Sequence, residues 1–217
     1  MQTISELLYY IAIVVIGLLP IANPFSTAPL FLTVSSNLDN DSRLRLLNLT
    51  CIYMFAILIV FLLAGALILS FFGISVSGLR IAGGLIITVL GFRMLFPEAP
   101  KEKDNIPIHT YEQARNFAFT PLAMPMLSGP GSIAVIISLA AKISVQENIL
   151  LRLSGYAVVG LGILVTVIIC WLVLRSSTKI IRILGPSGIN ALTRIMGFIL
   201  ICIGVEFTAS GIKGFFG

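Results

Sequence analysis

Residues 20–29 read PIANPFSTAP, and residues 121–130 read PLAMPMLSGP. The prolines of the two stretches recur 101 residues apart: Pro20 and Pro121, Pro24 and Pro125, Pro29 and Pro130. Both stretches lie within apolar sequence, where a proline removes an intrahelical hydrogen bond and clashes with the preceding turn. In lipid, the freed backbone groups must be buried in protein or line a wet cavity. The pattern therefore predicts two interrupted membrane helices with a binding site between them, which is typical of a secondary transporter.

The composition supports a membrane protein. Of the 217 residues, 58% are hydrophobic and 11% are charged, whereas a soluble domain has about 25% charged residues. The net charge is +5, but no basic stripe with interleaved aromatic residues is present, and this excludes nucleic acid as a partner. The three cysteines lie in apolar segments without metal-ligand spacing, so we expect no metal site. The predicted fold class is an all-α integral membrane protein in a lipid bilayer.

Six stretches are apolar enough to cross a membrane as helices, near residues 7–33, 48–72, 76–96, 117–141, 149–174 and 191–212. The charged stretch 97–116 contains three prolines and predicts a linker between two repeats of three spans, 1–96 and 117–217. Because each repeat has an odd number of spans, the two must insert in opposite orientations. The expected architecture is an inverted-topology repeat in which spans one and four are broken at the prolines.

The distribution of lysine and arginine predicts the orientation. Ten of these residues flank the odd-numbered loops: Arg43, Arg45, Arg93, Lys101, Lys103, Arg115, Arg175, Lys179, Arg182 and Arg194. Four lie on the other side: Arg80, Lys142, Arg152 and Lys213. The linker 97–116 is therefore expected in the cytoplasm, and both termini are expected outside. Arg80 and Arg194 open equivalent spans, where each could anchor its helix at the head groups or gate a pathway.

Glycines in the third and sixth spans predict close helix packing. Gly84 and Gly91 are seven residues apart, as are Gly197 and Gly204, so each pair lies on one helix face. Small residues on one face let helices approach closely in lipid. The contact could form within one chain or between the chains of a homo-oligomer.

The two proline stretches supply the candidate substrate site. Their polar side chains are short and neutral: Asn23, Ser26 and Thr27 in the first stretch, and Ser128 and Ser132 in the second. Pro24 and Pro125 break the helices, and Gly129 and Gly131 let a ligand approach the backbone. Hydroxyls, one amide and glycine backbone suit a small uncharged or zwitterionic solute. In the alternative interpretation, the prolines only kink the helices and the hydroxyls bond the preceding turn.

Glu206 is the acidic residue that lies clearly within a span. It follows Arg194 by 12 residues, or about 18 Å along a helix. A carboxylate inside the membrane indicates a proton carrier or a cation ligand, so Glu206 is the candidate for coupling to H⁺ or Na⁺. Alternatively, its side chain reaches the outer interface or pairs with Lys213.

Enzyme signatures are missing from the sequence. It contains no HExxH, no GxSxG and no Walker-type glycine-rich loop. A single histidine and few carboxylates leave little with which to build a catalytic centre. We therefore expect no enzyme, no catalytic residue, no cofactor and no ATP-driven transport.

Four stretches together resemble the MarC family of six-span bacterial inner-membrane proteins: ANPFSTAPLFL, GLRIAGGLIITVLGFRMLFP, PLAMPMLSGPGSIAVIIS and RIMGFILICIGVEF. The resemblance covers nearly the whole chain except the linker. It implies a bacterial inner-membrane location and a class of neutral amino acid transporters. Its implied motif residues are Asn23, Pro24, Pro125, Gly129, Pro130 and Gly131.

The sequence thus favours a secondary transporter of a small neutral solute, most simply a neutral amino acid. The solute would bind near the midplane between spans one and four, and one repeat would rock against the other to give alternating access. A channel-like pore and a membrane scaffold without transport activity are the two alternatives.

Overall fold

The structure is a computed structural model that describes residues 4–96 and 110–216, and within these ranges it is all-helical without strands. Its helices are α1 Ile4–Ala22, α2 Pro24–Ser35, α3 Asn40–Phe71, α4 Val76–Leu95, α5 Tyr111–Phe117, the π-helical η1 Ala118–Leu127, α6 Pro130–Ser144, α7 Ile149–Arg175 and α8 Ser177–Phe216. Five of them are long and apolar enough to cross a membrane, and the bent pair 111–127 and 130–144 makes up to six. The predicted class, an all-α membrane protein, is confirmed.

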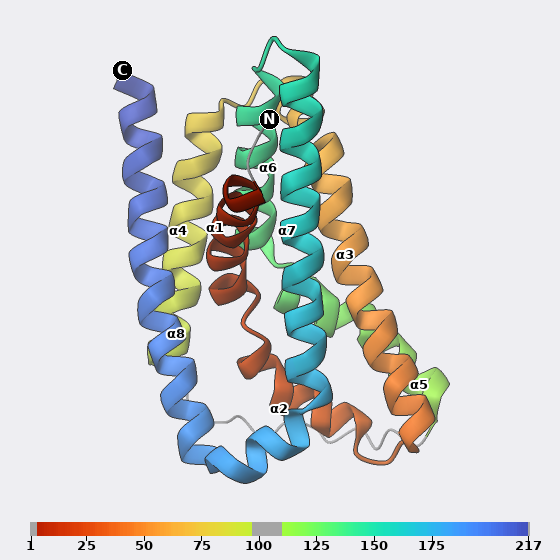
Figure 1. The fold of residues 1–217 in the computed structure, drawn as a ribbon. Helices are drawn as coiled ribbons and strands as arrows, with labels where there is room; N and C mark the ends of the chain where they lie inside the picture. The colour runs from red at the N-terminus through yellow and green to blue at the C-terminus, as the bar shows by residue number, and fades with distance from the viewer. Residues whose placement is uncertain (1–3, 97–109, 217) are drawn as a thin grey trace.

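The long helices α3, α4, α7 and most of α8 run roughly along one common axis (Figure 1). α1 starts and α8 finishes at the same end of the bundle, which we call the terminal end. α2 and the corner between α7 and α8 lie at the opposite end (Figure 1). α1 occupies the half of the bundle near the terminal end, and α2 continues into the other half. α6 returns from the middle of the bundle to the terminal end.

Two helices begin or bend at places that the apolar pattern did not indicate. α3 begins at Asn40, well before the apolar run, because the Asp39 side chain accepts hydrogen bonds from the N–H groups of Asp41 and Ser42. Hydrogen bonding from Ser42 lowers the pKa of Asp39, as expected for a carboxylate at a helix N-terminus. α8 bends at Gly185, whose φ of 63° is one that glycine adopts readily. Its first turns therefore run across the end of the bundle opposite the terminal end (Figure 1).

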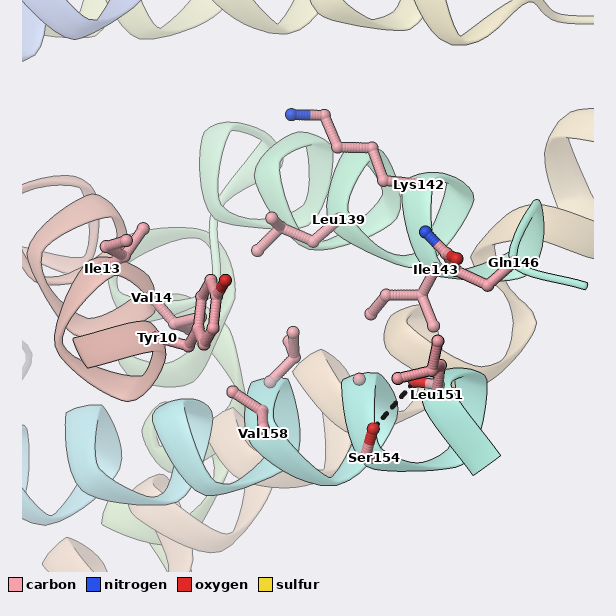
Figure 2. A pocket seen from close by; sticks show the side chains of 12 residues that line it. Tyr10, Ile13, Val14, Leu139, Lys142, Ile143, Gln146, Leu151, Ser154 and Val158 are labelled. Carbon is pink, nitrogen blue, oxygen red and sulfur yellow. Dashed lines mark hydrogen bonds between the residues drawn. The ribbon is translucent and has the colours of Figure 1, made fainter. Parts of the chain in front are cut away.

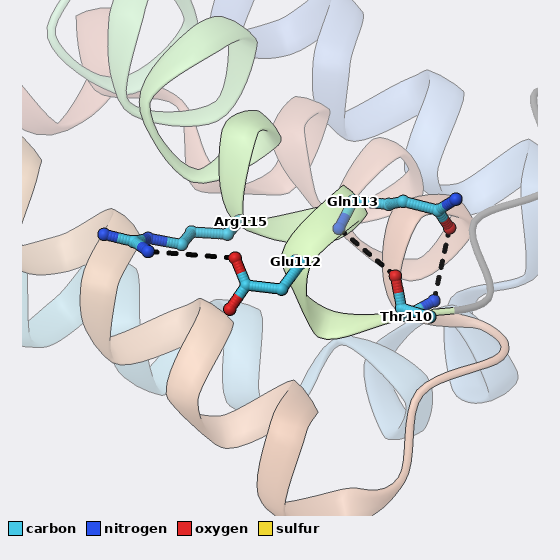
Figure 3. Close-up of polar contacts among 4 residues, drawn as sticks. All are labelled: Thr110, Glu112, Gln113 and Arg115. Carbon is cyan, nitrogen blue, oxygen red and sulfur yellow. Dashed lines mark hydrogen bonds and ion pairs between the residues drawn. The ribbon is translucent and has the colours of Figure 1, made fainter.

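The last residues of the predicted linker form a short helix, α5. Thr110 caps it by accepting a bond from the Gln113 N–H, and the Gln113 side chain accepts one from the Thr110 N–H (Figure 3). Arg115 and Glu112 form an exposed ion pair at 3.8 Å. This reciprocal cap is a strong helix-start signal within a stretch that the charge pattern assigned to a linker. Residues 97–109 of that linker lie outside the described residues.

The main apolar core joins α1, α2, α3, η1, α6 and α7. Glycines bring pairs of these helices close together. A Cβ at Gly162 of α7 would lie 2.6 Å from Val14 of α1, and a Cβ at Gly65 of α3 would lie 2.8 Å from Ile137 of α6. Both distances are far shorter than an ordinary carbon contact. Glycine at these positions therefore sets the spacing of the bundle.

α4 and α8 form an antiparallel pair beside this core (Figure 1). A Cβ at Gly84 would lie 2.5 Å from the Gly204 carbonyl oxygen, and one at Gly204 would lie 2.6 Å from the Gly84 carbonyl oxygen. Gly91 and Gly197 face each other in the same way, at 2.7 and 2.8 Å. The two backbones are therefore in direct contact along the glycine face, which we define as Gly84, Gly91, Gly197 and Gly204. The predicted small-residue faces pack against each other within one chain.

Candidate functional site

The first proline stretch contains an interruption at one residue. α1 ends at Ala22, α2 begins at Pro24, and Asn23 between them has a φ of 33°, in the left-handed region. Asparagine tolerates this region better than most residues do. Its side-chain oxygen accepts a bond from the Ser26 N–H at 3.3 Å and so caps α2. Proline suits the following position because the first residue of a helix needs no N–H partner.

The Asn23 carbonyl oxygen accepts hydrogen bonds from the two hydroxyls of this stretch. Ser26 Oγ donates to it at 3.0 Å, and Thr27 Oγ1 donates to it at 3.3 Å. The Asn23 Nδ2 group points to a different helix, where it donates to the sulfur of Met94 at 3.7 Å. Asn23 is 3% exposed and Thr27 is 1% exposed, whereas Ser26 is partly exposed.

The second proline stretch is interrupted over more residues. Thr120 and Met124 precede Pro121 and Pro125, and both have extended backbone angles inside η1, as the ring of a following proline favours. The chain then turns at Ser128 and Gly129, and the axis changes by 64° between residues 111–127 and α6. Asn23 and Met124 occupy equivalent places in the two stretches, each directly before the middle proline.

The two interruptions lie against each other. A Cβ at Gly131, in the first turn of α6, would lie 3.1 Å from Ile21 in the last turn of α1. It would also lie 2.8 Å from Ile87, a fully buried residue of α4. The fold therefore brings the end of α1 and the first turn of α6 together beside α4.

The candidate residues of the second stretch contact protein groups. Ser128 Oγ donates to the Met54 carbonyl oxygen of α3 at 3.4 Å, and Ser132 Oγ donates to the Leu127 carbonyl oxygen at 3.5 Å. Both serines are fully buried. A Cβ at Gly129 would lie 2.5 Å from the Pro125 carbonyl oxygen, so the turn itself requires glycine there. Pro24 is buried, whereas Pro125 is exposed.

Glu206 lies apart from the two interruptions. It is exposed and lines a hollow of about 540 Å³ between α4, α6 and α8 at the terminal end. Arg80 and Lys142 line the same hollow, and Arg80 Nε donates to Ser138 Oγ of α6 at 2.9 Å. Among the described residues, Glu206 forms no ion pair with Lys213. The hollow therefore combines two cations and one carboxylate.

A second hollow lies on the other side of α6, between α1, α6 and α7 (Figure 2). Its volume is about 340 Å³. Aliphatic side chains such as Leu139, Ile143 and Val158 point into it, beside the ring of Tyr10 (Figure 2). Lys142 borders both hollows. The end of α6 around Lys142 therefore borders one hollow on each of two sides.

Sequence reasoning overlooked two groups of this region. Met94 was one apolar residue among many, and its contact with Asn23 joins segments 71 residues apart. The sequence predicts that Arg80 is a head-group anchor or a gate, but its bond to Ser138 depends on the packing of α4 on α6. The serine at 138, inside an apolar run, was the available signal. Within the ranges described, no three His, Cys, Asp or Glu side chains gather to hold a metal ion.

The long apolar helices and the buried interruptions define an integral membrane protein that crosses the bilayer several times. A family model described as MarC family integral membrane protein matches residues 8–216. The chain belongs to the MarC family.

Similar proteins carry the name UPF0056 inner membrane protein MarC. The protein from Citrobacter koseri is 42% identical over 215 residues, which covers 95% of this chain and 96% of the relative. The protein from Escherichia coli K12 is 42% identical over 212 residues, with the same coverage. No solved structure matches the chain. The relatives and the apolar helices together identify a multi-pass inner-membrane protein.

Proposed function

We propose that this protein is a secondary transporter of a small neutral solute, most simply a zwitterionic amino acid. The observation that carries the proposal is the meeting of two interrupted helices inside the bundle. Asn23, Ser128 and Gly129 are each buried, and interrupted helices at membrane depth are typical of transporter binding sites. Spans one and four would be the broken members of two inverted repeats, 1–96 and 117–217.

The charged hollow at the terminal end supports a zwitterionic solute. Arg80 and Lys142 offer cations to a carboxylate, and Glu206 offers a carboxylate to an ammonium group. A neutral amino acid carries both groups, so its two charges would find opposite partners. On this proposal the hollow is the entrance, and Glu206 either receives the substrate ammonium or couples transport to H⁺ or Na⁺.

The closed state of the interruptions indicates where the protein must move. The hydroxyls of Ser26, Thr27, Ser128 and Ser132 bond protein carbonyls, so a solute must take over some of these partners. The glycine face holds α4 and α8 in backbone contact although they would belong to different repeats. We propose that this pair moves as one body, while the chain flexes at Asn23 and at Gly129.

The proposed orientation follows from charge. The end of the bundle opposite the terminal end carries Arg43, Arg175, Lys179 and Arg182 around one hollow, and positively charged ends face the cytoplasm. The terminal end would therefore face the periplasm, with both termini outside and the linker 97–116 inside. A solute entering at Glu206 would come from the periplasm.

A thermal-stability screen of the purified protein tests the proposal. Neutral amino acids are added at rising concentration, with pH and Na⁺ varied, and Trp171 fluorescence reports unfolding because it is the single tryptophan. A ligand at 100 times its dissociation constant adds about 2.7 kcal/mol to the folded state. We expect a saturable rise in melting temperature with at least one neutral amino acid.

Two serine variants locate the binding site. Ser128→Ala removes a hydroxyl at the interruption, and we expect the response to the amino acid to weaken. The matched control, Ser154→Ala, removes a hydroxyl that bonds the Leu151 carbonyl oxygen in the aliphatic hollow, and its response should equal that of the wild type. If both variants respond to the amino acid as the wild type does, the solute does not bind at Ser128.

Transport itself separates the alternatives. In proteoliposomes, an alternating-access transporter takes up labelled amino acid with saturation and exchanges it against unlabelled amino acid on the other side. A channel conducts without such exchange. A scaffold shows neither uptake nor a melting shift, and this outcome would overturn the proposal.

A further inference from the structure

We infer a binding site for an anionic phospholipid at the end of the bundle opposite the terminal end. The site begins with a hollow of about 560 Å³ between α2, the start of α3, the end of α7 and the start of α8. We call it the basic hollow. Four cationic side chains and one carboxylate line it: Arg43, Arg175, Lys179, Arg182 and Asp41.

The positive charge of the basic hollow is weakly compensated. Among the described residues, the ion pair found is that of Glu112 with Arg115, so Asp41 pairs with none of the four cations. Gathering like charges in one hollow is unfavourable unless an anion neutralises them. α8 also begins at this hollow, and its N-terminal dipole adds to the positive potential.

Two arginines of the basic hollow are held in place by aromatic rings. Arg43 lies 5.5 Å from the centre of the Phe31 ring and donates to Thr178 Oγ1 at 2.9 Å. Arg175 lies 4.7 Å from the centre of the Trp171 ring. Stacking on a ring fixes the plane of a guanidinium and leaves N–H groups for an anion. A preorganised donor set of this kind suits a phosphate group.

An apolar groove lies further along two of the helices that line the basic hollow, α3 and α7. It has a volume of about 410 Å³ and is lined by Asn48, Cys51, Ile52, Phe55, Leu164, Val167, Ile168 and Trp171. Trp171 contacts both regions, because the Arg175 guanidinium stacks on its ring and its Nε1 donates to Asn48 Oδ1 at 2.8 Å. A tryptophan at this place marks the level of the lipid head groups.

The combination identifies the ligand as a lipid. A free phosphate would bind to the cations alone, because an apolar groove makes no favourable contact with it. A phospholipid with a net negative head group would place its phosphate among Arg175, Lys179 and Arg182, and lay an acyl chain along Ile52 and Ile168, which are exposed at 60% and 48%. Basic hollows between membrane helices bind anionic lipid head groups in this way.

Lipid titration of the delipidated protein tests the inference. The melting temperature is measured with phosphatidylglycerol, with phosphatidylcholine, and with glycerol 3-phosphate as a head group without acyl chains. We expect a saturable rise with phosphatidylglycerol alone. An equal rise with phosphatidylcholine would overturn the charge requirement, and an equal rise with glycerol 3-phosphate would assign the hollow to a free phosphate.

Paired variants locate the lipid. Arg175→Gln with Lys179→Gln removes two cations of the basic hollow, and the apparent affinity for phosphatidylglycerol should fall about 10- to 30-fold. The control, Arg93→Gln with Arg194→Gln, removes the same charge from residues outside the hollow and should leave the affinity unchanged. Equal losses in the two pairs would mean general attraction to an anionic surface and overturn the site.

A measurement on the wild-type protein tests the same inference without any variant, so impaired folding of a variant cannot affect the result. Native mass spectrometry of the wild-type protein, given phosphatidylglycerol and phosphatidylcholine in equal amounts, should show one phosphatidylglycerol retained preferentially. Retention should decrease at raised ionic strength, because salt screens the attraction. Equal retention of the two lipids would overturn the inference.

Discussion

Replacing Gly84 by alanine is expected to destabilise the folded protein by about 1–3 kcal/mol, and replacing it by leucine by more. The added Cβ would meet the Gly204 carbonyl oxygen at 2.5 Å and the Thr208 nitrogen at 2.7 Å. Both atoms belong to the α8 backbone, which cannot turn aside as a flexible side chain can. α4 and α8 would have to separate and lose contact along the glycine face.

Thermal unfolding in detergent, followed by the fluorescence of Trp171, measures this effect. Gly17→Ala is the matched control, since a Cβ at Gly17 in α1 would meet no atom within 4 Å. Alanine in an open helix interior stabilises a helix relative to glycine by up to about 1 kcal/mol. The two variants should therefore shift the melting temperature in opposite directions. A Gly84→Ala protein as stable as the wild type would refute backbone contact between α4 and α8.

Replacing Asn23 by alanine should destabilise the protein by about 2 kcal/mol. Alanine cannot accept the bond from the Ser26 N–H, and the loss of such a helix cap costs about 0.5–2 kcal/mol. Alanine also tolerates the left-handed backbone at φ 33° less well than asparagine. Asn23→Gly should lose only a few tenths of a kcal/mol, because glycine suits this φ and is an acceptable cap.

The same pair of variants separates stability from binding. If Asn23 contacts the proposed solute, Asn23→Gly will fold nearly as well as the wild type but lose the melting shift with the amino acid. If Asn23 only shapes the interruption, Asn23→Gly will keep that shift. Equal destabilisation by alanine and glycine would contradict the left-handed geometry, since only glycine relieves it.

The membrane class and most of the helices could be predicted because lipid imposes simple rules on sequence. A span must be apolar over a fixed length, and residues 48–72, 76–96 and 149–174 meet this rule and overlap helices α3, α4 and α7. The seven-residue spacing of the glycines predicted a close contact because it follows from helix geometry alone. It did not reveal that Gly84 meets Gly204, because the partner depends on packing.

The ends of the helices and the details of the site were harder to predict. α3 begins at Asn40 because the Asp39 side chain caps it, and a hydropathy profile does not reveal such a cap. The candidate polar residues were chosen by their chemistry, but their partners, such as Met94 for Asn23, join distant segments. The basic hollow could not be predicted because its cations, spread along the sequence, indicate only orientation, and the packing of four helix ends gathers them into one place.

The glycine face has a consequence for the history of the molecule. The contact is antiparallel, and each helix contributes two glycines seven residues apart, so the two faces are nearly interchangeable. An interface between like surfaces related by a two-fold axis is one that identical chains can form. If the proposed inverted repeats arose from one half-length ancestor inserted in both orientations, two copies of it would have paired through this face. Gene fusion would then have preserved the contact and left each half free to diverge.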